Sequence, residues 1–267
     1  MSRLVRTTGI VLARYDWGNT SRVFTFLTRS GGRLGALLKG ARRPRGRPGL
    51  GGGLDLLSEN EILYYQRRTG LSVLAEWSEI TSSAGLGRDA VRFAAAEVCA
   101  EFARECTAEG QADPEIYDLL SEGACLAAGA ERLVPLAASV ALGMLAAAGL
   151  GPPPDRCAAC GEVFAETGRS VRRVLSAEQG GLLCGACGRA ARADGDGIRL
   201  SAESTALFGA LLRMEPAAAA RLRPSRKAED ELLRGVEHYA SWRLERRMKG
   251  LSGLRAIIAG LETVGCR

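Results

Sequence analysis

Histidine and aromatic residues are scarce in this chain of 267 residues, and no group of carboxylates stands out as a metal site. His238, the only histidine, lies between Glu237 and Tyr239, and no Ser/His/Asp or Cys/His arrangement can be assembled around it from the sequence. Carboxylates are scattered and do not form the clusters that hold magnesium in nucleases. We therefore expect a binding protein and not an enzyme.

Targeting and membrane signals are also missing. The beginning, MSRLVRTTGIVLARYDW, has no long apolar run and no small-residue cleavage site, which predicts a cytoplasmic location. Residues 133–154 are uncharged but rich in Ala, Gly and Pro, which is more typical of a buried core helix than of a membrane span. With 46% hydrophobic residues, the chain should fold into two or three modules with full cores.

Positive charge is concentrated in the first third of the chain. Residues 1–80 contain 13 Lys and Arg against 6 Asp and Glu, a net charge of +7, whereas the remaining residues carry 23 against 24, a net charge of −1. Such an asymmetry indicates that an N-terminal module binds a polyanion.

The same region has the pattern of a small β-barrel. Five segments rich in Val, Leu, Phe and Tyr are separated by turn signals, and such short strands are typical of a closed or nearly closed antiparallel barrel of the OB-fold type. An SH3-like barrel is the structural alternative. The five segments are residues 8–15, 21–28, 33–39, 56–66 and 71–77.

The segment KGARRPRGRPGLGGG at residues 39–53 joins the third of these strands to the fourth. Its prolines and glycines disfavour helix and strand, so its cations should stand off the barrel, where they can bind the phosphates of a nucleic acid. A merely solubilising loop is the alternative. The candidate DNA-binding residues are Lys39, Arg42, Arg43, Arg45 and Arg47.

Beyond residue 87 the hydrophobic pattern changes to a helical period. Asp113 followed by Pro114 is a helix start signal, and Ser201 is another. The pattern predicts an α+β protein whose second module is all-helical, with helices over residues 89–106, from Asp113, over 133–150, from Ser201, and over Lys227–Lys249 as the last long helix.

Four of the eight cysteines form two Cys-x-x-Cys-Gly motifs separated by 23 residues. This pattern is typical of two knuckles that hold one structural zinc ion through four thiolates, with each glycine allowing a sharp turn. An iron cluster and disulfides are the alternatives, and disulfides are rare in the cytoplasm. The predicted ligands are Cys157, Cys160, Cys184 and Cys187, whereas Cys99, Cys106, Cys125 and Cys266 are expected to act as small hydrophobic residues.

Five stretches spread over essentially the whole chain can be compared with known families: KGARR (39–43), YYQRRTGLSVLAEWSEI (64–80), LGMLAAAGLGPPPDRCAACG (142–161), GGLLCGAC (180–187) and RRMKGLSGL (246–254). Together they resemble the RecO family of bacterial recombination mediators. The resemblance implies an OB-fold that binds single- and double-stranded DNA, annealing of complementary strands, and joint action with RecR in loading RecA onto strands coated by single-stranded DNA-binding protein. It also implies a non-enzymatic, nucleoid-associated role, with Lys39, Arg42 and Arg43 as the best DNA contacts.

Arg243, Arg246 and Arg247 lie at the expected end of the last long helix, just before Gly250. Interaction with the helix dipole and a glycine cap explains them in one way. The resemblance offers another, in which they receive the acidic tail of single-stranded DNA-binding protein.

Four parts of the chain are expected: an OB-fold at residues 1–80, helical parts at 81–154 and 196–267, and a zinc-binding insert at 155–195. The alternative function is an OB-fold and zinc-knuckle RNA-binding factor of translation or ribosome assembly. A preference for RNA over single-stranded DNA would distinguish it.

Overall fold

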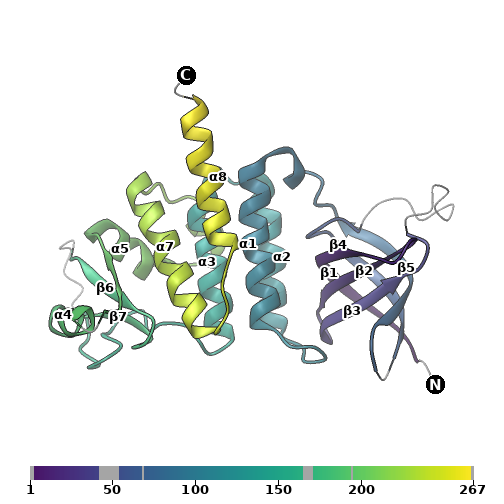
Figure 1. Ribbon diagram of the computed structural model, residues 1–267, viewed down its shortest axis with the longest axis horizontal. Helices are drawn as coiled ribbons and strands as arrows, with labels where there is room; N and C mark the ends of the chain where they lie inside the picture. The colour runs from purple at the N-terminus through teal and green to yellow at the C-terminus, as the bar shows by residue number, and fades with distance from the viewer. Residues whose placement is uncertain (1–2, 42–53, 68, 165–170, 194, 266–267) are drawn as a thin grey trace.

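The computed structural model describes residues 3–41, 54–67, 69–164, 171–193 and 195–265. A barrel lies at one end of an elongated molecule, helices fill the middle, and a small sheet lies at the other end (Figure 1). The predicted α+β fold class is confirmed. The elements are β1 (Arg3–Trp17), β2 (Ser21–Thr28), β3 (Gly32–Leu38), β4 (Glu59–Gln66), β5 (Ser72–Thr81), η1 (Leu86–Arg88), α1 (Ala90–Cys106), α2 (Pro114–Gly129), α3 (Leu133–Ala147), β6 (Arg173–Ser176), β7 (Gly181–Leu183), α4 (Gly185–Ala193), β8 (Ile198–Leu200), α5 (Ala202–Leu211), α6 (Pro216–Ala219), α7 (Arg226–Arg243) and α8 (Gly250–Gly265).

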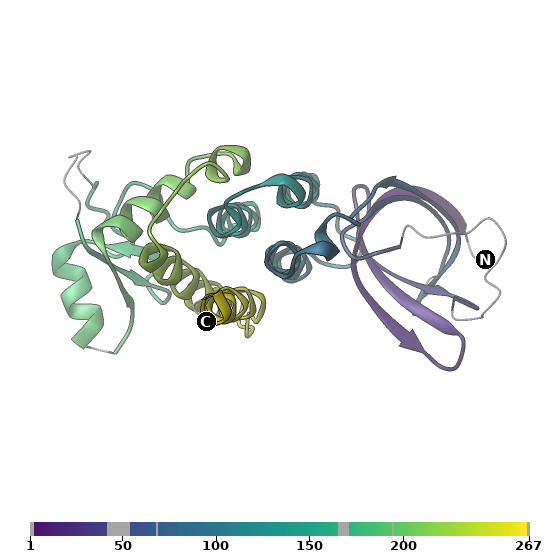
Figure 2. The ribbon, with the colours of Figure 1, turned by 90° about the horizontal axis from the view of Figure 1, so that it is seen from above.

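The first five strands form a closed barrel in the order β1-β2-β3-β5-β4, which Figure 2 shows as a ring. The β3–β5 pair is parallel and the other pairs are antiparallel. The barrel is of the predicted OB-fold type and not SH3-like. Alternating side chains fill its interior, with Val11, Phe26 and Ile62 fully buried.

The barrel and the helices are packed together through a continuous core. Ile10, Leu12 and Leu27 of the barrel belong to the same buried cluster as the residues of α1 and α3. Gly32 has φ +65°, and a Cβ there would lie 2.0 Å from the carbonyl oxygen of Gln111, so only glycine fits at this contact. The close packing should therefore hold the barrel firmly against the helices.

The helix α3 is the centre of the bundle and packs against α1, α2 and α7. Most of its residues are buried, as its uncharged sequence predicts. Among the described helices, none is both long and apolar enough to cross a membrane. The predicted helix starts are confirmed, because Asp89, Asp113 and Ser201 each accept a hydrogen bond from a backbone N–H in the first turn that follows.

The prediction of one last helix over Lys227–Lys249 is wrong. Helix α7 ends at Arg243, Glu245 takes φ +52°, and a further helix, α8, begins at Gly250. Glu101 on α1 holds the start of α8, because its carboxylate accepts hydrogen bonds from the N–H groups of Lys249 (2.9 Å) and Gly250 (2.7 Å). Gly250 is therefore not a cap of α7, but the start of the next helix.

Candidate functional site

The first cysteine pair lies in a tight turn after the central helix. The N–H of Cys157 donates to the carbonyl of Glu162 (2.8 Å), and the N–H of Gly161 donates to the carbonyl of Cys157 (2.9 Å). Gly161 has φ +76°, which favours glycine. The predicted knuckle with its glycine turn is confirmed here.

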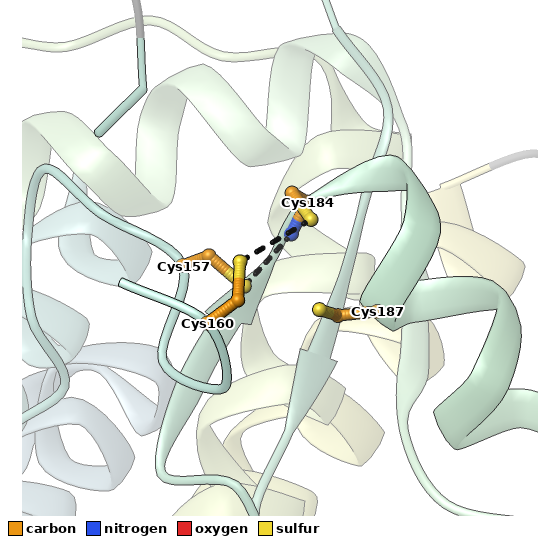
Figure 3. A group of neighbouring side chains, drawn as sticks. All are labelled: Cys157, Cys160, Cys184 and Cys187. Carbon is orange, nitrogen blue, oxygen red and sulfur yellow. Dashed lines mark hydrogen bonds between the residues drawn. The ribbon is translucent and has the colours of Figure 1, made fainter. Parts of the chain in front are cut away.

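The second pair has a different backbone. Cys184 directly follows β7, and Cys187 lies in the first turn of α4 (Figure 3). Gly188 is helical, and a Cβ there would lie 3.0 Å from Cγ2 of Val174. The sharp turn predicted for this glycine is wrong, because the residue is needed for close packing of α4 on β6.

The four sulfur atoms form a compact cluster, and all lie within 4.8 Å of one another. The Sγ atoms of Cys160 and Cys184 are 3.8 Å apart. Thiolates placed tetrahedrally around zinc at about 2.3 Å have an edge of about 3.8 Å, whereas a disulfide needs about 2.05 Å. None of the cysteines in the described residues forms a disulfide, so the four residues fit one metal ion that joins the two cysteine pairs.

The surroundings of the sulfurs favour a thiolate at Cys157. Burial raises the pKa of this thiol, but hydrogen bonds from the N–H groups of Cys160, Cys184 and Ala159 oppose it and lower the pKa to about 6. The neighbouring Cys184 and Cys160 raise the pKa of Cys187 to about 12. A cation that binds all four sulfurs must displace the remaining protons, so its affinity falls as the pH falls.

Other cysteines in the helical part have no such role. Burial raises the pKa of Cys99 and of Cys106 to about 12, which makes both thiols unreactive. Cys125 is exposed on α2. Cys266 lies outside the described residues.

The predicted DNA-binding segment begins at one end of the barrel. Lys39 follows β3 directly and is exposed, and it makes no ion pair within the described part of the chain. Arg42, Arg43, Arg45 and Arg47 lie outside the described residues. Their role as phosphate contacts stays a prediction.

The pairing of the strands places the ends of several strands around this end of the barrel, which is here called the barrel rim. Arg22 is opposite Leu38, Leu37 is opposite Val73, and Val73 is opposite Tyr65. Because Trp17 is opposite Ser21, the ends of β1, β3 and β4 follow one another around the rim. The β1–β2 turn, the basic segment and the β4–β5 turn all leave the barrel there, and the first and last of these are nucleic-acid-binding loops in OB-folds.

Three exposed aromatic side chains near the rim were not singled out from the sequence. Tyr15, Trp17 and Tyr65 are 57%, 60% and 45% exposed, in a chain with only 5% aromatic residues. The signal in the sequence that could have identified them is the position of an aromatic residue at or near the end of a predicted strand. Exposed rings on a basic barrel can stack with nucleic-acid bases, each worth roughly 1–3 kcal/mol.

Four arginines of the barrel are neutralised by carboxylates. Lys39 and Arg67, which follow β3 and β4, are not paired in this way within the described residues. Two uncompensated cations are therefore present at the rim. The neutralised pairs are Arg6 with Glu61, Arg14 with Asp55, Arg22 with Asp16, and Arg29 with Asp118.

The structure separates the three predicted partner-binding arginines into two kinds. Arg246 and Arg247 are exposed in the turn between α7 and α8. Arg243 is the last residue of α7, is only partly exposed, and has its guanidinium 5.9 Å from the centre of the Trp242 ring. Only Arg246 and Arg247 present freely accessible charge.

The only histidine lies near a serine and an aspartate, but in an order that does not suit catalysis. Nε2 of His238 is 3.9 Å from Oδ1 of Asp196, and the hydroxyl of Ser176 donates to the other oxygen of Asp196. Asp196 therefore lies between the histidine and the serine. Because Ser176 is fully buried, this group is structural rather than a nucleophile and its base.

Comparisons with known proteins agree with this architecture. The family model described as "Recombination protein O N terminal" matches residues 1–83, and the one described as "Recombination protein O C terminal" matches residues 87–252. The chain belongs to the RecO family. Its relatives include proteins named DNA repair protein RecO from Anaeromyxobacter sp. (strain Fw109-5), with 35% identity over 92% of this chain and 95% of the relative, and from Nocardioides sp. (strain ATCC BAA-499 / JS614), with 32% identity over 93% and 98%.

The barrel lies within the residues that the N-terminal family model matches, and the cysteine cluster lies within those that the C-terminal model matches. The relatives are named as DNA repair proteins. This favours DNA over the RNA-binding alternative.

Proposed function

We propose that the protein binds single- and double-stranded DNA at the barrel rim, anneals complementary strands, and acts with RecR to load RecA onto strands coated by single-stranded DNA-binding protein. The observation that carries the proposal is the barrel rim of a RecO-family chain, where exposed aromatic rings lie beside uncompensated cations. We also propose that the cysteine cluster holds one zinc ion with a structural role.

The chemistry of the rim suits annealing. Cations that contact the backbone phosphates bind any sequence and leave the base edges unoccupied. Rings that stack on bases through their faces are equally tolerant of sequence. A strand held in this way keeps its Watson–Crick edges available for a complementary strand.

The direct test is annealing of complementary oligonucleotides by the purified protein. Faster pairing of DNA strands than of RNA strands is expected. A wild-type protein that anneals neither bare nor coated strands would show that the proposal is wrong.

Replacing Lys39, Arg42 and Arg43 together by Ala is expected to weaken oligonucleotide binding. Each lost phosphate contact on a single strand lowers the slope of log affinity against log salt by about 0.7, so the slope should fall by about 2. Fluorescence anisotropy over a range of salt concentrations measures both quantities. An unchanged affinity and slope would remove the segment from the mechanism.

A matched control removes the same number of charges from the same barrel. Arg6, Arg14 and Arg29 are ion-paired with carboxylates, and their replacement by Ala lowers the net charge equally. A clearly smaller effect is expected, since these cations are already neutralised. Equal effects would mean that overall charge, and not the segment, governs binding.

Charge reversal of Arg246 and Arg247 to Glu tests the proposed docking of the acidic tail. Arg243 is left unchanged because it is only partly exposed and its guanidinium lies near the Trp242 ring. Binding of the tail peptide should be lost and annealing of coated strands should slow, while annealing of bare strands continues. The control is Arg221→Glu with Lys227→Glu, two exposed residues outside this turn. If both annealing reactions fall equally, the turn contacts DNA instead.

A further inference from the structure

A second concentration of arginine lies at the end of the molecule opposite the barrel. Strands β6, β7 and β8 and helix α4 surround a cavity of about 450 Å³ beside Cys184. Arg189 and Arg192 are one turn apart on α4, and Arg199 comes from β8. Five arginines line the cavity: Arg172, Arg173, Arg189, Arg192 and Arg199.

The charge of these arginines is poorly compensated. Within the described residues, none of the five forms an ion pair with a carboxylate, although Glu162 is close enough to act on Arg173 electrostatically. A metal ion held by four thiolates adds a net charge of about −2, which five guanidinium groups exceed. The cavity therefore attracts anions when the cysteine cluster is loaded.

The arginines differ in how they are held. Arg172, Arg189, Arg192 and Arg199 are exposed, so their guanidinium groups can reach a ligand. Arg173 is partly buried and lies over the ring of Phe164, with 3.5 Å between the guanidinium carbon and the ring centre. One cation is thus fixed by stacking, and four surround the opening.

The cavity also has an apolar floor, to which Val174, Leu183 and Gly188 contribute. Val174 and Leu183 are buried, and Gly188 lets α4 approach β6 closely. A volume of about 450 Å³ lies within the range of roughly 300–1,000 Å³ that is usual for small-molecule sites. An apolar floor with a rim of guanidinium groups matches a nucleotide unit, whose base is flat and whose phosphate is anionic.

We propose that this arginine-lined cavity is a second binding site for a nucleic-acid strand, with the arginines on backbone phosphates and a base against the floor. It rests on the proposed function only in assuming that the ligand is nucleic acid. The barrel and α4 lie at opposite ends of the molecule (Figure 1), so one chain can hold two strands at once. Holding both raises the effective concentration of each strand near the other.

The first experiment isolates the second site in the full-length protein. In the Lys39→Ala, Arg42→Ala, Arg43→Ala background, residual binding of fluorescein-labelled oligodeoxythymidylate is compared with and without Arg189→Ala and Arg192→Ala. Losing two phosphate contacts should lower the slope of log affinity against log salt by about 1.4, so that the affinity lost over a fourfold rise in salt concentration is about sevenfold smaller. Unchanged residual affinity and salt dependence would overturn the inference.

Arg189 and Arg192 share α4 with Cys187, so their replacement could weaken binding by disturbing the metal site. Two further variants distinguish this effect from the loss of a ligand contact. Arg189→Lys with Arg192→Lys keeps the charge and should keep most of the binding. Arg199→Ala changes β8 instead of α4 and should also weaken binding, at unchanged metal content. Loss of binding only in variants that lose metal would show that the arginines serve the fold and not a ligand.

The second experiment asks whether two strands bind together. One oligodeoxythymidylate is immobilised through biotin, and retention of a second, labelled copy is measured; these strands cannot pair with each other. The wild-type protein should retain the second strand, and the Arg189→Ala, Arg192→Ala variant should not. Because no annealing is involved, this result is independent of the annealing proposal. A wild-type protein that binds the first strand but never retains the second would overturn the inference.

Discussion

Cys157→Ser is expected to lower the metal content from one zinc ion per chain to near zero and to unfold the region around the two knuckles. Cys157 is only 1% exposed, and its sulfur accepts a hydrogen bond from the N–H of Cys184 at 3.3 Å. Serine supplies a poorer ligand for a soft site, and metal binding in such sites is coupled to folding. Loss of a structural metal is among the few single changes that exceed about 4 kcal/mol.

Elemental analysis of protein purified without a chelator measures the metal, and limited proteolysis between residues 155 and 200 measures the local unfolding. Cys125→Ser is the matched control, because Cys125 is exposed on α2 and lies outside the cluster. It should keep both the metal and the protease resistance. Iron in the wild-type protein, or full zinc content in Cys157→Ser, would contradict the prediction.

The barrel and the cysteine cluster could be predicted because their signals are local or use a strict spacing. Strand β2 was recognised with its observed limits from SRVFTFLT alone. The two Cys-x-x-Cys pairs imply that distant segments meet, because a tetrahedral metal needs four ligands. Trp17 and Tyr65 could be recognised from the sequence only as aromatic residues near strand ends, because the exposure of their rings depends on how the barrel closes.

Other features depend on contacts between distant residues and were missed. Strands β6, β7 and β8 have only three or four residues each, too few to show an alternating pattern. The arginine-lined cavity combines residues from β6, α4 and β8, which only the fold brings together. The start of α8 depends on Glu101, which lies 149 positions before Gly250.

Glu101→Ala is expected to destabilise the protein by roughly 3 kcal/mol, because it leaves two N–H groups at the start of α8 without their charged acceptor. The side chain of Glu101 is nearly buried, so water cannot fully replace it. A fall in Tm of about 6–12 °C should follow, with faster hydrogen exchange across residues 250–261. Glu101→Gln, which keeps an oxygen acceptor but not the charge, should lose less.

Glu97→Gln is the control for Glu101, since Glu97 lies one turn earlier on the same helix. Burial raises the pKa of Glu97, so its ionised form is disfavoured in the folded state, and any stability this group contributes is lost as the pH rises through the raised pKa. Removing its charge should leave the Tm at neutral pH unchanged or slightly higher.

The turn with Arg246 and Arg247 lies just before α8, so Glu101→Ala should also weaken binding of the acidic tail peptide. An unchanged Tm together with unchanged exchange in α8 would show that Glu101 does not hold this helix in place.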